Sequence, residues 1–115
     1  STRAQVRFVT REDGVSFSEH PEKINAQFYV HNDGYPEFLG VEIANSLLDS
    51  KKVDSWEIEY LDTEHGDLDY IYYVWQAPGK TTWVSIFENA NAYTDEKEKC
   101  IFVGELQALQ TKYDN

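Results

Sequence analysis

The chain has 115 residues, and its 10 Lys and Arg against 21 Asp and Glu give a formal net charge of −11. With 41% apolar and 15% aromatic residues it can build a folded core, which argues against intrinsic disorder. No apolar run approaches the roughly 18 residues that a transmembrane helix needs. The negative charge argues against direct binding to a nucleic-acid backbone, and the length predicts a single domain over residues 1–115.

The single cysteine, Cys100, cannot form an internal disulfide. Its apolar neighbours favour a buried thiol in a strand over a nucleophile. The first residues contain no apolar stretch typical of a signal peptide. We therefore expect a soluble cytoplasmic protein with no cofactor, no metal and no membrane partner. The sequence is compatible with a monomer and with a homo-oligomer.

The first half of the chain predicts two strands and a helix. Residues 4–9 and 24–30 have the alternation of half-buried strands, and the two are expected to pair as a hairpin. After Gly34 the period changes, because Leu39, Ile43 and Leu47 recur at every fourth residue, with Ala44 and Leu48 widening the stripe. This pattern predicts an amphipathic helix that ends near residues 49–52, where two lysines oppose the negative end of the helix dipole.

The second half is strand-like. Trp56, Ile58 and Tyr60 alternate with Glu57 and Glu59, which predicts an antiparallel strand with a buried apolar face and a solvated acidic one. Further strands are predicted over 69–76, 80–87 and 100–103, and a terminal helix over 105–113.

The strand over 69–76 should be central, because residues 70–75 leave no polar face. The turn Ala77-Pro78-Gly79-Lys80 has the residues of type II. The order of elements predicts an α+β fold, a single domain with a mostly antiparallel β-sheet and one or two helices packed on one face.

Unusual residues gather over 29–37, where a strand ends and the helix begins. Loops at such junctions often carry function, although Asp33-Gly34 and Pro36 also suit a turn and a helix start. The candidate binding residues are His31, Asp33, Tyr35 and Glu37. A general acid–base pair of His31 with Asp33 or Glu37 is the best available arrangement for a hydrolase.

The string Tyr29-Val30-His31-Asn32-Asp33-Gly34-Tyr35-Pro36-Glu37, followed by Leu39-Gly40, resembles the Tyr-x-His-x-Asp-Gly-Tyr-Pro-Glu signature of small bacterial and phage proteins. Residues 1–4 and 102–106 are similar to the ends of those proteins, so the resemblance covers the whole chain, with the central motif its specific part. Asn32 stands where such proteins commonly carry an aromatic residue. The resemblance implies a domain type and no particular reaction, in a phage or prophage setting such as host takeover or anti-defence.

The acidity is uneven, because residues 53–79 contain no Lys or Arg. Seven carboxylates fall there: Asp54, Glu57, Glu59, Asp62, Glu64, Asp67 and Asp69. They predict either a solvated face or an interaction face that imitates a phosphate backbone. Residues 62–69 do not fit a calcium loop, since Gly66 falls fifth instead of sixth.

Five aromatic residues of the second half could line a groove that stacks a base or a peptide: Trp56, Tyr70, Tyr72, Trp75 and Trp83. No nucleophile motif or metal-ligand spacing accompanies them. The sequence therefore favours a non-catalytic binding or interaction domain with a protein partner or a small ligand. The alternatives are an acidic nucleic-acid mimic that inhibits a host nucleic-acid-binding or defence protein, and a small hydrolase that uses His31, Asp33 and Glu37.

Overall fold

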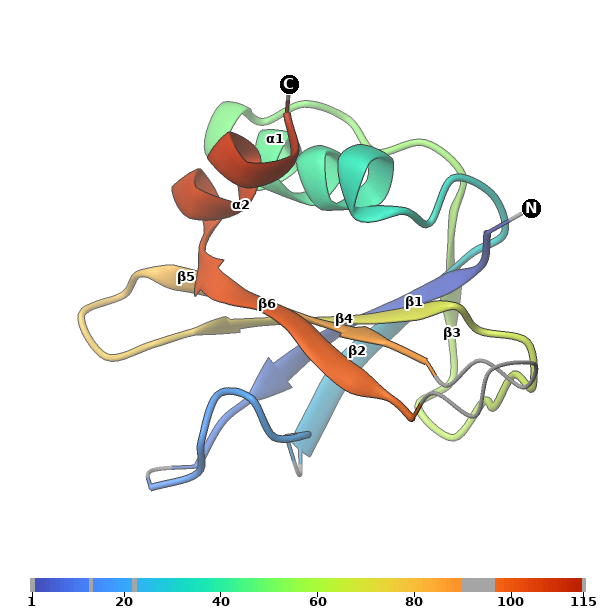
Figure 1. Cartoon of the computed structure of the whole chain (residues 1–115), viewed down its shortest axis with the longest axis horizontal. Coiled ribbons are helices and arrows are strands. Elements are labelled where there is room, and N and C mark those ends of the chain that lie inside the picture. The colour runs from blue at the N-terminus through green and yellow to red at the C-terminus, as the bar shows by residue number, and fades with distance from the viewer. Residues whose placement is uncertain (1, 13, 22, 90–96, 115) are drawn as a thin grey trace.

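The computed structural model describes residues 2–12, 14–21, 23–89 and 97–114 (Figure 1). The strands are β1 (Ala4–Thr10), β2 (Lys23–Val30), β3 (Trp56–Glu59), β4 (Tyr70–Gln76), β5 (Thr82–Glu88) and β6 (Lys99–Glu105). A π-helical turn, η1 (Pro36–Gly40), leads into helix α1 (Val41–Asp49), and α2 (Leu106–Tyr113) follows β6. Within these ranges, no helix has the length and apolar character to cross a membrane.

The strands form one sheet in the order β3-β2-β1-β4-β5-β6, and the predicted α+β class is confirmed. Neighbouring strands are antiparallel except β1 and β4, which are parallel. This parallel pair arises because β2 and β3 lie on one side of β1, and the chain after β3 crosses to the other side, where β4 runs in the same direction as β1. The backbone N–H groups of Asp69 and Tyr70 then donate to the carbonyl of Arg3, at 2.8 and 3.3 Å.

The two faces of the sheet are covered differently. Both helices lie on one side, which we call the helix face, while the loops between β1 and β2 and between β3 and β4 lie on the other, the loop face (Figure 1). The core of the helix face is the larger, and includes Ala4, Val6, Val30, Leu39, Ile43, Tyr72, Val74, Val84, Ile86 and Leu109. The core of the loop face consists of Val9, Ile71, Tyr73, Trp75 and Phe87.

The amphipathic stripe of α1 is buried along its first part. Ile43 is fully buried and Leu39, in the preceding turn, is 1% exposed, as the spacing predicts. Leu47 is 45% exposed, however, so the stripe does not continue to the end of the helix. The reason is that the last turn stands over a cavity of about 240 Å³, lined also by Phe8 and Val74, instead of a filled core.

Burial raises the pKa of several tyrosines, among them Tyr72 and Tyr73, and raises that of Tyr70 to about 12, with the Glu88 carboxylate adding to the effect. A phenol whose pKa is higher in the folded than in the unfolded chain stabilises the fold below pH 10, and this stability is lost as the pH rises through the folded pKa. We expect the free energy of unfolding in urea to fall between about pH 10 and 12. Phenolate absorbance should appear at higher pH in the native protein than in the urea-unfolded chain; coincident titration curves would contradict this.

Candidate functional site

The junction between β2 and α1 is fixed to the sheet at Gly34. Asp33 before it adopts a left-handed φ of 58°. The Gly34 N–H donates to the Thr2 carbonyl (3.1 Å), and the Gly34 carbonyl accepts from the buried Tyr72 hydroxyl (2.6 Å). A Cβ at position 34 would lie 3.0 Å from the Ala4 Cβ, so this close approach requires glycine. These contacts hold the junction loop on β1 and β4.

A cavity of about 480 Å³ opens beside this junction. Asp33 and Glu37 line it from the segment before α1, and Lys51 and Lys52 line it from the segment after the helix. Its apolar lining comes from Val30, Phe38, Leu39 and Val41. The lining thus contains two carboxylates before α1 and two lysines after it. Two further carboxylates belong to it, that of Glu42 within the helix and that of Asp54 after the lysines.

Glu42 of α1 anchors residues 50–55, the segment between α1 and β3, through two hydrogen bonds. One carboxylate oxygen accepts from the Trp56 indole N–H (2.6 Å) and the other from the Asp54 backbone N–H (3.2 Å). Ser50 and Ser55, which bracket this segment, have left-handed φ values of 55° and 61°. Such backbone is costly without glycine, persists where surrounding contacts determine it, and is concentrated at binding sites.

The four predicted binding residues do not form one site. Asp33 and Glu37 come together in the wall of the cavity, whereas His31 does not line it. The His31 side chain is exposed, with Nε2 3.3 Å from a Glu57 carboxylate oxygen and its ring edge-on to Tyr29. Among the described residues, the carboxylate that His31 contacts is therefore that of Glu57, and not that of Asp33 or Glu37.

The aromatic residues that the sequence singled out pack mostly against other side chains of the fold. Tyr35, the fourth predicted binding residue, is half exposed and packs towards Phe38 and Tyr70 at ring-centroid distances of 6.4 and 6.3 Å. Tyr72 and Trp75 are buried in the cores of opposite faces. The expectation of a single groove with Tyr72 and Trp75 among its walls is wrong, because strand residues an odd number of positions apart point to opposite faces.

The seven carboxylates of residues 53–79 are divided between the surface and internal contacts. Asp67 forms an ion pair with Arg3 at 2.9 Å, and Asp69 accepts the Arg3 backbone N–H at 3.0 Å. Glu57 contacts His31, and Glu59 points into the loop face. Asp54, Asp62 and Glu64 are exposed. A face that presents all seven to a partner stays a prediction, and four of them have partners within the chain.

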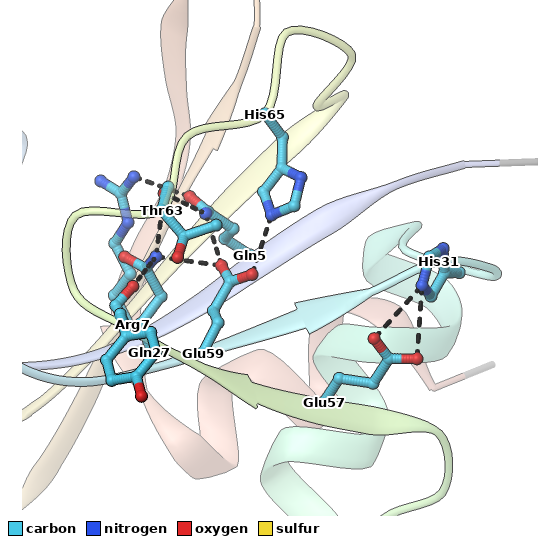
Figure 2. A network of polar contacts seen from close by, with 9 residues as sticks. Gln5, Arg7, Gln27, His31, Glu57, Glu59, Thr63 and His65 are labelled. Carbon is cyan, nitrogen blue, oxygen red and sulfur yellow. Dashed lines mark hydrogen bonds and ion pairs between the residues drawn. The ribbon is translucent and has the colours of Figure 1, made fainter.

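Glu59 is the centre of a polar network on the loop face that the sequence did not reveal (Figure 2). One carboxylate oxygen accepts from the Gln5 and Gln27 amides, at 2.8 and 2.9 Å, and the other lies 2.8 Å from His65 Nε2. Both glutamine side chains are fully buried. The Tyr29 ring stacks on His65 at 3.9 Å, and burial raises the Tyr29 pKa.

The predicted burial of β3 is therefore wrong at its end. Ile58 and Tyr60 are 75% and 86% exposed, whereas the Glu59 side chain is 12% exposed. The cause is the position of the strand at the margin of the sheet: Glu59 lies opposite Gln27 of β2, whose amide needs an acceptor.

The network continues across the loop face. Arg7 donates to Gln5 Oε1 (2.7 Å) and to the Tyr73 hydroxyl (3.0 Å). Because arginine only donates, the Tyr73 O–H is free to donate to His20 Nδ1 at 2.7 Å. His20 Nε2 then carries a proton, which it donates to Glu98 at 2.5 Å. Polar contacts thus connect β3 to the start of β6.

The Cys100 thiol lies half-buried in β6, and burial raises its pKa. A thiol of raised pKa is a poor nucleophile at neutral pH. Within the described part of the chain, no three His, Cys, Asp or Glu side chains gather as a metal site would require. The cavity beside the β2–α1 junction, the junction cavity, is lined by charged side chains, and Gly34 and Glu42 anchor the segments on its two sides.

Comparison of the chain with protein-family models, with curated proteins and with solved structures gave no match.

Proposed function

We propose that this protein is a non-catalytic binding domain whose junction cavity holds a short peptide with free termini. One observation carries the proposal: Asp33 and Glu37 line the cavity before α1, and Lys51 and Lys52 line it after the helix. Of the other two lining carboxylates, Glu42 accepts from the Trp56 indole, and Asp54 follows the lysines in the chain. A ligand with an ammonium group and a carboxylate would match both charge signs, while its apolar part would cover Phe38.

The dimensions support a ligand of this size. The nine residues of α1 correspond to about 13 Å of helix, which is the length of about four extended residues. A volume of about 480 Å³ lies within the range of small-molecule pockets. Because Gly34 and Glu42 anchor both flanking segments, the site needs little reorganisation to bind.

The test is a titration of ¹⁵N-labelled protein with glycine, with two- to four-residue peptides of free termini, and with the same peptides blocked at one or both ends. We expect free peptides to shift the amide signals of residues 32–38 and 51–55, and blocked peptides to shift them less. Asp33→Asn should weaken binding about tenfold without disturbing the fold, since asparagine tolerates the left-handed backbone.

Lys52→Gln should weaken binding to a similar degree, because it removes the charge at the other end of the cavity. Asp62→Asn is the matched control, since Asp62 is exposed and does not line the cavity. Free and blocked peptides that bind equally well, or shifts confined to other regions, would refute the proposal.

A further inference from the structure

The two most exposed large apolar side chains of the described chain lie on β3 and directly after it. Among the described residues, β2 pairs with β3 on one side, so that β3 forms a margin of the sheet. Ile58 and Tyr60 are 75% and 86% exposed, and Leu61, which follows, is 49% exposed. An edge strand presents unpaired backbone N–H and carbonyl groups, and here apolar side chains stand beside them.

The two outer strands of the sheet, β3 and β6, differ in how well they could pair with an added strand. At the other margin the register between β5 and β6 shifts, so that Ile101 forms a bulge between Cys100 and Phe102. A bulge bends the strand and interrupts its ladder, which hinders the addition of a further strand. The register between β2 and β3 is regular over all four pairs. The β3 edge is therefore the margin on which a further strand fits.

A second copy of this chain does not fit that edge. Antiparallel pairing about a two-fold axis places residues of equal parity opposite each other, because the same faces of both sheets must coincide. Three of these registers set a glutamate against a glutamate: Glu57 against itself, Glu57 against Glu59, or Glu59 against itself. The fourth sets Trp56 against itself and pairs no other residue of β3 with β3. Like charges directly opposite each other are destabilising.

The charges around the edge select the occupant. The Glu57 side chain is 63% exposed, and Asp62 and Glu64 are exposed in the loop that follows the strand. No lysine or arginine occurs between Val53 and Gly79. We propose that β3 docks an extended basic segment of a partner protein, in which lysine or arginine faces Glu57 and apolar residues cover Ile58 and Tyr60. Backbone pairing would supply affinity, and the alternation of side chains would supply specificity. This surface does not depend on the ligand of the junction cavity.

The test uses synthetic peptides of about ten residues in which lysine alternates with valine, isoleucine or threonine. We expect such a peptide to shift the amide signals of residues 56–61, to slow hydrogen exchange in β3, and to bind more weakly as salt is raised. Peptides with glutamate in place of lysine, or with a central proline that removes a backbone donor, should bind at least about tenfold more weakly.

Two variants of the protein test whether the peptides bind at β3. Glu57→Lys should weaken binding of the lysine peptides about tenfold and favour the glutamate peptides, and Ile58→Ser should weaken both. Leu47→Ser, at an exposed apolar residue of α1, is the control that should leave binding unchanged. The proposal is overturned if no peptide of the panel perturbs β3, if Glu57→Lys leaves affinity unaltered, or if the protein alone forms dimers that Ile58→Ser disrupts.

Discussion

Replacing Glu59 with alanine is expected to lower the free energy of unfolding by about 3 kcal/mol, because it leaves buried amide donors without their charged acceptor. Gln5 and Gln27 are fully buried, and both donate to the same Glu59 oxygen. The Thr63 carbonyl, 3.3 and 3.2 Å from the two amide nitrogens, limits the loss. Urea unfolding followed by tryptophan fluorescence measures the effect.

Glu57 provides a control on the same strand and face. Its side chain is 63% exposed, and it contacts the half-exposed His31 at 3.3 Å. An exposed pair of this kind contributes little, so Glu57→Ala should change stability by less than about 0.5 kcal/mol. Equal effects at the two positions would show that Glu59 does not organise the loop face.

Ile43→Ala is expected to cost about 2–5 kcal/mol, the range for deleting a buried branched side chain. Ile43 is fully buried in the core beneath α1, among residues of both helices and the sheet. Because α1 forms a side of the junction cavity, a shift of the helix should also weaken ligand binding there. Thermal and urea unfolding test the first effect.

Leu47, one turn further along α1, gives the matched comparison. It is 45% exposed, so Leu47→Ala removes fewer contacts and should cost less than about 1 kcal/mol. If both variants were equally destabilised, the last turn of α1 would have to be packed against the sheet, contrary to the observed cavity.

The elements and the fold class were predictable because they depend on local patterns. The four-residue spacing of Leu39 and Ile43 gave the helix, and the Pro78-Gly79 turn is present, with Gly79 at φ 89° and the Lys80 N–H donating to the Ala77 carbonyl. The parallel pairing of β1 with β4 has no local signal, since it depends on which side of β1 the chain returns to. The burial of β3 was mispredicted because alternation alone does not say which face is covered.

The candidate site was partly predictable for the same reason. Asp33 and Glu37 were singled out by their place at a turn and at a helix start, and both line the cavity. The lysines after α1 were interpreted as partners of the helix dipole, because nothing in the sequence shows that they return to the same cavity. The loop-face network needed the strand register: Gln27 lies beside Arg7 on one side and Glu59 on the other, and each residue alone is typical of a solvated strand face.

The parallel pair also has a consequence for synthesis of the chain. A growing polypeptide leaves the ribosome from its N-terminus, and domains fold as units once their parts are available. The hairpin of β1 and β2 is complete at Val30, but the neighbour of β1 on its other side is complete only at Gln76, and the fully buried Leu109 follows later still. Until β4 has been synthesised, β1, which becomes an inner strand of the sheet, is itself an unprotected edge. The nascent chain therefore has a long interval in which a chaperone, or a neighbouring nascent chain, can occupy the place of β4.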